Sequence, residues 1–173
     1  MIYILKSVIF NLMKFLSVFI ILLLLFLPAQ TYSQSSQVEP VSLEQALKTA
    51  AEQEKKILVD VYAAWCPYCQ RMHSEVYVDN DVVAAINEHF ILVRINVESD
   101  ETVRYHGNEM TESEFAQALQ NRNVPTTYFL NHEGAIIGSQ PGYLEESVFS
   151  NLLKFVGSDA FLTQTFDEYL ENR

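Results

Sequence analysis

With 173 residues and a formal net charge of −11, the chain has room for one domain with a proper hydrophobic core. Its acidity argues against binding of nucleic acid or an anionic membrane surface through a basic patch. The sequence contains two cysteines, Cys66 and Cys69, which excludes a framework of several structural disulfides.

The first 33 residues are predicted to be a secretory signal peptide. Lys6 and Lys14 form a basic flank, the apolar run over 16–27 follows, and small and polar residues come after it. An uncleaved membrane anchor over 7–27 is the alternative. In both cases we expect the folded part to be exported to the periplasm, free or anchored at the inner membrane, and joined to the N-terminal segment by a polar linker over 34–41.

A helix and then a buried strand are predicted after the linker. Ser42 and Gln45 have the spacing of a capping box, and apolar residues recur at helical spacing after them. The nearly continuous apolar run over 57–63 is typical of a strand buried on both faces. Asp60 interrupts this run, and a carboxylate there is costly unless it has a partner or a function.

The two cysteines follow this strand directly, in the segment Trp65-Cys66-Pro67-Tyr68-Cys69. A strand that leads into a Cys-x-x-Cys pair at the start of a helix is typical of a redox site. The N–H groups and the dipole at a helix N-terminus favour a thiolate. We therefore predict a redox-active disulfide, in which Cys66 is the nucleophile and Cys69 resolves the mixed disulfide.

The rest of the chain alternates between apolar runs and amphipathic segments, which predicts further strands and helices. Residues 98–110 are polar and carry charges of both signs, so they are predicted to form a surface loop. In chain order we expect a helix from 43 to about 54, a strand at 57–63, helices at 70–77 and from 80, a strand at 91–97, the loop, a helix at 111–121, a strand at 128–130, a turn at 131–134, a strand at 135–138, a helix at 144–156 and a last helix over 161–170.

This order predicts an α/β fold with a mixed sheet of four to five strands and helices on both faces. Strands joined by a helical crossover should be parallel, and the tight turn at 131–134 should add an antiparallel strand. We assign 42–157 to this domain and 158–173 to a C-terminal helical extension.

Residues 42–156 resemble the thioredoxin superfamily. The segment 58–66 is similar to the strand that enters the active site in that family, including an acidic residue six positions before the first cysteine. Val124-Pro125-Thr126 resembles the loop with the cis proline that faces the disulfide, and Gly142 has the place of a glycine that lines the substrate groove. The dipeptide Pro67-Tyr68 departs from the Gly-Pro of thioredoxins proper, and exported bacterial thioredoxin-like proteins look closest.

The resemblance implies a thioredoxin fold and a protein-disulfide oxidoreductase that needs no cofactor and acts as a reductase rather than an oxidase. It implies disulfide-containing protein substrates, a thiol-disulfide electron-donor protein as partner, and a monomer. Asp60 would take the proton of Cys69, with Arg94 as a basic residue near it. Contacts to the substrate are expected from Trp65, Pro67, Tyr68, Val124, Pro125 and Gly142.

An alternative function follows from His73, which lies four residues after Cys69. A continuous helix would place Cys66, Cys69 and His73 near one face, and two thiolates with an imidazole could bind zinc or copper(I) in a metallochaperone. No fourth ligand is evident in the sequence, so we predict no metal at this site. A redox-inactive binding module is disfavoured by the intact cysteine pair.

Overall fold

The computed structural model describes residues 37–172. The predicted signal peptide and the start of the linker lie outside the described residues. Within 37–172 the structure contains no helix that is both long enough and apolar enough to cross a membrane.

Four strands form the central sheet: β1 (Lys56–Tyr62), β2 (Phe90–Asn96), β5 (Thr126–Leu130) and β6 (Ile136–Pro141), in the order β2-β1-β5-β6. β1 and β2 are parallel, and β5 is antiparallel to both β1 and β6. The sheet is therefore mixed, as the sequence predicted, with a parallel pair from the helical crossover and an antiparallel strand from the tight turn.

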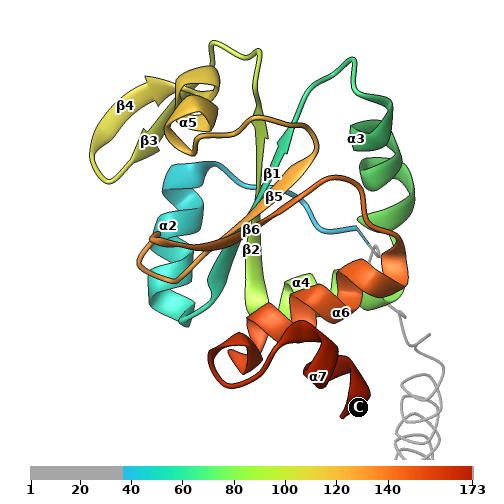
Figure 1. The fold of residues 1–173 in the computed structure, drawn as a ribbon. Coiled ribbons are helices and arrows are strands. Elements are labelled where there is room, and N and C mark those ends of the chain that lie inside the picture. The colour runs from blue at the N-terminus through green and yellow to red at the C-terminus, as the bar shows by residue number, and fades with distance from the viewer. Residues whose placement is uncertain (1–36, 173) are drawn as a thin grey trace, which may run out of the picture. The chain divides into compact units, whose positions relative to one another are not determined.

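Helices cover both faces of this sheet. α2 (Leu43–Gln53) and α5 (Glu112–Ala118) pack on one face, whereas α3 (Pro67–Arg71), α4 (Asn80–His89) and α6 (Glu146–Gly157) lie on the other (Figure 1). Each face encloses its own cluster of buried apolar side chains. This arrangement confirms the predicted thioredoxin fold.

Local sequence signals account for where several helices begin. The Ser42 hydroxyl accepts a hydrogen bond from the backbone N–H of Gln45 at 3.3 Å, which is the serine half of the predicted capping box. At the start of α5 both halves form, because Thr111 and Glu114 each accept a hydrogen bond from the backbone N–H of the other. Asp79 caps α4 from one side only, because its Oδ1 accepts hydrogen bonds from the backbone N–H groups of Asp81 and Val82.

The prediction of a surface loop over 98–110 is wrong. This segment forms a hairpin of β3 (Thr102–Tyr105) and β4 (Asn108–Thr111), and the turn residues His106 and Gly107 both have positive φ. Most side chains of the hairpin are exposed, so its strands are polar and lack an apolar pattern. The hairpin is held to the domain by Val103, which is buried, and by the Tyr105 ring, which lies 5.1 Å from that of Phe115.

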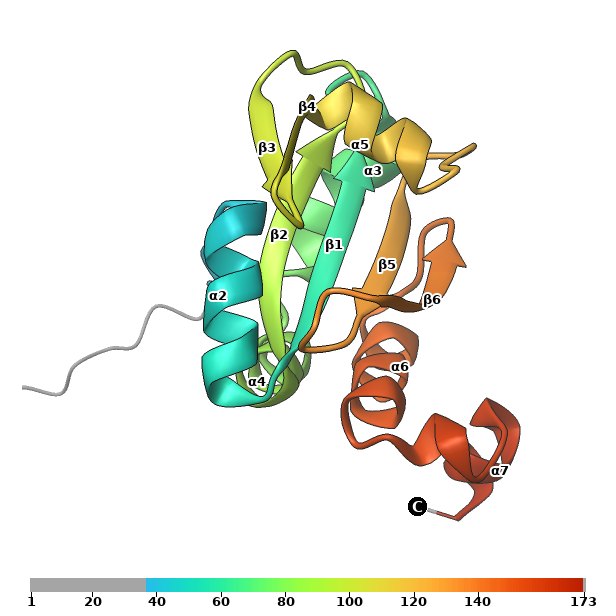
Figure 2. The ribbon, with the colours of Figure 1, turned by 90° about the vertical axis from the view of Figure 1, so that its left-hand side faces the viewer.

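The C-terminal extension consists of a short 3₁₀ helix, η2 (Ala160–Leu162), and α7 (Phe166–Glu171). It packs on α6 through a group of aromatic rings around Phe155, and it lies at the other end of the sheet from the start of α3 (Figures 1 and 2). The extra helix is thus confirmed. The apolar stripe of this extension is only partly buried, because Leu162 is 70% exposed.

Candidate active site

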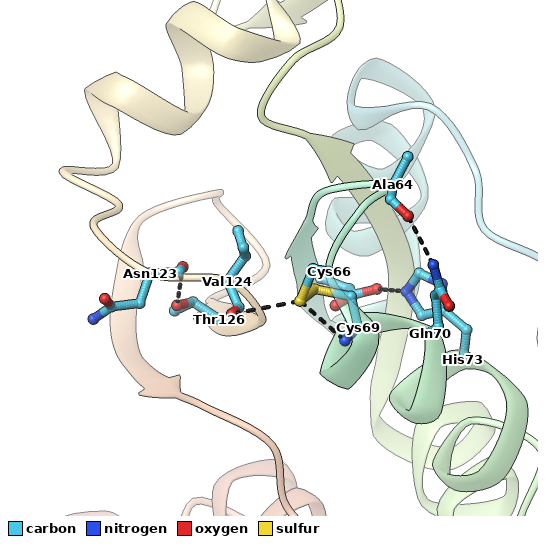
Figure 3. Close-up of a disulfide and its surroundings, with 9 residues drawn as sticks. Ala64, Cys66, Cys69, Gln70, His73, Asn123, Val124 and Thr126 are labelled. Atoms are coloured by element: carbon cyan, nitrogen blue, oxygen red, sulfur yellow. Dashed lines mark hydrogen bonds and ion pairs between the residues drawn. A yellow bond between two sulfur atoms is a disulfide. The ribbon is translucent and has the colours of Figure 1, made fainter.

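The two cysteines are joined by a disulfide at the start of α3, with their Cα atoms 5.3 Å apart (Figure 3). Cys66 is the N-cap of α3, and its Sγ accepts a hydrogen bond from the backbone N–H of Cys69 at 3.2 Å. Pro67 occupies the first helical position. A backbone N–H there would have no acceptor within the helix, so its absence in proline costs no hydrogen bond. The sequence around the cysteines thus places the sulfur of Cys66 among the free N–H groups that begin a helix.

A second loop faces the disulfide. The peptide bond between Val124 and Pro125 is cis, as predicted, and the carbonyl oxygen of Val124 lies 3.6 Å from Cys66 Sγ (Figure 3). The Pro125 carbonyl accepts a hydrogen bond from the N–H of Gly142 at 2.8 Å, and Thr126 Oγ1 donates to the Asn123 carbonyl at 2.8 Å. These bonds hold the loop in place beside the disulfide.

Exposed aromatic side chains surround the disulfide. Trp65 and Tyr68 are 65% and 58% exposed, so both side chains are accessible from solvent. The Tyr143 ring lies 5.9 Å from that of Tyr68, and the Arg71 guanidinium stacks over Tyr143 at 4.6 Å. Sequence reasoning missed Tyr143 and Arg71 as neighbours of the site, although Tyr143 directly follows Gly142.

Asp60 lies on β1, the strand that leads into the cysteine pair, with 0% of its side chain exposed. Its neighbours across the sheet are Arg94 on β2 and Thr127 on β5. Arg94 Nε is 3.6 Å from Asp60 Oδ2, so the structure brings the predicted basic residue to the buried acid. Asp60 Oδ1 has no hydrogen-bond partner among the described residues. A buried carboxylate oxygen without a partner is costly, so Asp60 remains a candidate for the chemical role expected from the sequence.

His73 contacts Asp60 directly, which the sequence did not predict. The distance from His73 Nε2 to Asp60 Oδ2 is 2.6 Å. At this point α3 passes into a π-helical turn, η1 (Met72–Val76), which is closed by a hydrogen bond from the Tyr77 N–H to the Met72 carbonyl at 2.9 Å.

The position of His73 weakens the alternative of a metal site. Its Nε2 is directed to Asp60, and within 37–172 no three His, Cys, Asp or Glu side chains are arranged to hold a metal ion. A metallochaperone site of Cys66, Cys69 and His73 is therefore not favoured.

Two tyrosines lie beside the Asp60–His73 pair. Burial, followed by the negative charge of Asp60, raises the pKa of Tyr77 well above its usual value. Burial, followed by the charge of Glu112, also raises the pKa of Tyr62. Both phenols therefore stay protonated at neutral pH, and neither can serve as the base of the site.

All the residues predicted for the site lie on the segments that surround the disulfide: β1, the start of α3, the loop before β5 and the end of β6. Gly142 has a φ of +87° and an open position where a side chain would stand. Gln70 is an addition that the sequence did not suggest, since its side-chain amide donates to the Ala64 carbonyl at 2.9 Å and ties the loop before Cys66 to α3.

The thioredoxin-fold protein from Helicobacter pylori is a solved structure that shares this fold, with a TM-score of 0.55, 24% identity and coverage of 81% of this chain and 84% of that one. A thioredoxin from Thermus thermophilus has a TM-score of 0.56 at 22% identity and covers 69% and 87% of the two chains. Likenesses at this identity establish the fold alone.

Curated relatives include the thiol:disulfide interchange protein DsbD of Vibrio vulnificus, 27% identical over 128 residues, which are 68% of this chain and 20% of that protein. The DsbD of Colwellia psychrerythraea is 27% identical over 130 residues, 74% of this chain and 20% of that protein. The chain thus spans about a fifth of the length of these relatives. A family model for the thioredoxin-like domain matches residues 43–157, well over half of the sequence, and the chain belongs to this family.

Proposed function

We propose that this protein is an exported thiol-disulfide oxidoreductase that reduces disulfides in other proteins. The observation that carries the proposal is the disulfide at the start of α3, which faces the cis-proline loop and follows the strand that holds the buried carboxylate of Asp60. The name of the DsbD relatives, thiol:disulfide interchange protein, supports the same chemistry.

In the proposed reaction the reduced Cys66 thiolate attacks a substrate disulfide. A bond forms between Cys66 Sγ and a substrate sulfur, and the other substrate sulfur leaves as a thiolate. Cys69 then loses its proton to Asp60 and attacks Cys66 Sγ, which breaks the bond to the substrate. Two electrons pass from the cysteine pair to the substrate, and a thiol-disulfide donor protein restores the reduced pair.

The loop around Pro125 would align the substrate. An extended substrate segment can form backbone hydrogen bonds with Val124, as in recognition by strand addition. Trp65, Pro67 and Tyr68 would contact the substrate from the α3 side, and the absent side chain of Gly142 leaves room on the other. Tyr143, which lies against Tyr68, extends this contact surface.

The direction of electron flow is proposed from Asp60 and Trp65, which resemble the corresponding residues of reducing relatives. Potentials in the superfamily run from about −270 to about −120 mV, and we expect this cysteine pair near the reducing end. Equilibration with glutathione buffers measures this potential. A value near the oxidising end would contradict a reductase and leave the exchange chemistry itself intact.

The variant Cys69→Ser tests the exchange reaction. Without the resolving thiol, the mixed disulfide between Cys66 and the substrate should persist, so that reduced Cys69→Ser accumulates a covalent complex with insulin, detectable by non-reducing electrophoresis and mass spectrometry. Cys66→Ser is the matched control and should trap none. If Cys69→Ser stays free under these conditions, Cys66 is not an exchanging nucleophile.

Export to the periplasm is proposed from the sequence of residues 1–33. The Lys6 and Lys14 flank and the apolar run support it. Fractionation of cells that express the full chain, with mass spectrometry of the mature N-terminus, distinguishes a cleaved signal from an anchor.

A further inference from the structure

We propose that His73 and Asp60 form a proton-relay pair, in which His73 releases a proton to solvent as Asp60 takes one from Cys69. The inference rests on the proposed exchange reaction, because it concerns the fate of the Cys69 proton. It adds to that reaction a positioning residue that connects the buried acid with water.

Asp60 is isolated from solvent. Its side chain is 0% exposed, and a proton taken up at Oδ1 has no direct route to water. His73 contacts both the buried carboxylate and solvent, since its Nε2 lies 2.6 Å from Asp60 Oδ2 while 22% of its side chain is exposed. The histidine therefore provides a link between the carboxylate and bulk water.

The His73 ring is held by its backbone turn and by two neighbouring tyrosine rings. His73 lies in the π-helical turn, and such turns occur frequently at functional sites. The Tyr62 ring meets the His73 ring edge-on at 5.1 Å, and the Tyr77 ring lies 6.0 Å away. Figure 3 shows His73 on the side of the cysteine pair away from Val124, so that it leaves the substrate side free.

The other polar groups around the Asp60–His73 pair are poorly suited to exchange a proton with solvent. Arg94 Nε is 3.6 Å from Asp60 Oδ2 and forms no hydrogen bond with a described residue, and a guanidinium keeps its proton. Tyr62 and Tyr77 stay protonated because burial raises the pKa of each. Thr127 lies opposite Asp60 on β5 and does not titrate. An imidazole, in contrast, ordinarily exchanges its proton near neutral pH.

The proton count closes over one cycle. The proposed cycle starts, in the reduced protein, from an Asp60 carboxylate and a His73 ring with two protons, which together make a neutral pair. When Cys69 attacks Cys66, the S–H bond breaks, the proton moves to Asp60 Oδ1, and His73 gives a proton to water. When a donor thiolate reduces the disulfide, Cys69 leaves as a thiolate and regains the proton from Asp60, while His73 takes one from water. The pair thus stays neutral throughout.

Ellman's reagent separates the two steps, because it releases one coloured thiolate when Cys66 attacks and a second when Cys69 resolves the mixed disulfide. The variant His73→Gln keeps a hydrogen-bond donor for Asp60 but cannot gain a proton. We expect its first release to match the wild type and its second to be about ten-fold slower at pH 7, which is less than the roughly 100-fold or larger contribution of a group that takes the proton directly. The pH dependence of the second release between about pH 5 and pH 8 should flatten.

His132→Gln is the matched control, since His132 is exposed in the turn before β6, and it should leave both releases unchanged. A folded His73→Gln with the wild-type second release and pH profile would overturn the relay. A wild-type protein that lacks the first release would instead refute the exchange reaction, so the two failures are distinguishable.

A measurement on the wild type does not depend on any substitution at His73. Nitrogen-15 shifts of the His73 ring should indicate two ring protons in the reduced protein and one in the oxidised protein at neutral pH. In Asp60→Asn this difference should vanish. Identical His73 shifts in the two redox states of the wild type would contradict the proposal.

Discussion

Asp60 has a single carboxylate oxygen free to accept a proton, so its replacement should affect one step of the reaction. Asp60→Asn keeps the shape of the side chain and removes the base. We expect the second release from Ellman's reagent to slow by about 100-fold, at the lower end of the contribution of general base catalysis, while the first release is spared. Stopped-flow absorbance measures both steps. Equal slowing of both would indicate a general distortion of the site, and unchanged release kinetics would exclude Asp60 as the base.

How far the sequence predicts the site also differs from residue to residue. Asp60 is conspicuous because it is an acid within an apolar strand, and the cysteines and Pro125 belong to short local motifs. The contact between His73 and Asp60 joins residues 13 positions apart, one in η1 and the other on β1, so no short sequence motif contains it. A regular helical repeat places His73 with the cysteines instead, which is why a metal site could be considered from the sequence.

At the scale of secondary structure, the C-terminal extension depends on one aromatic side chain of α6. The Phe155 ring lies 5.3 Å from the rings of both Phe166 and Tyr169 and 6.5 Å from that of Phe161. Phe155→Ala should lower the free energy of unfolding by about 3–5 kcal/mol and expose the extension to protease. Urea denaturation and limited proteolysis test this.

The control for Phe155 is Leu162→Ala on η2, because Leu162 is 70% exposed and should change stability little. Equal losses in the two variants would contradict a special role for Phe155. The expected ΔΔG also assumes that the extension folds with the domain, so a Phe155→Ala protein with full stability would show that the two unfold separately.

Helices and strands were predictable where residues close together in the sequence carry the signal, as in an apolar run or a helix cap. The strands β1 and β2 are apolar because they are buried, and the capping residues Thr111 and Asp79 mark helix starts directly. The hairpin of β3 and β4 was missed because its strands are largely exposed and their pairing depends on the turn at His106 and Gly107. Polar strands of this kind look like loops in a sequence.

The whole molecule carries a net charge of −11, and loss of Lys6 and Lys14 with a signal peptide would make it more negative. Charge of one sign attracts oppositely charged reactants and repels others. The reduced protein should therefore react with cystamine, a dication, more slowly as salt is added, and with oxidised glutathione, an anion, faster. The ratio of the two rates should fall by about ten-fold or more between low salt and about 1 M salt, where screening is nearly complete. Parallel salt dependences for the two disulfides would contradict steering by charge.

The order of the sheet has a consequence for the behaviour of the protein at high concentration. β2 and β6 are the two edges, and an open edge is where a second copy could add its own strand. The segment before α2 lies along β2, where the Val41 N–H donates to the Leu92 carbonyl at 2.9 Å. β6 pairs with an irregular register near Phe129 and Leu130, and it ends at Pro141, which has no N–H to offer. Neither edge presents a long regular ladder, so we expect the molecules to remain separate in solution, without joining edge to edge into larger aggregates.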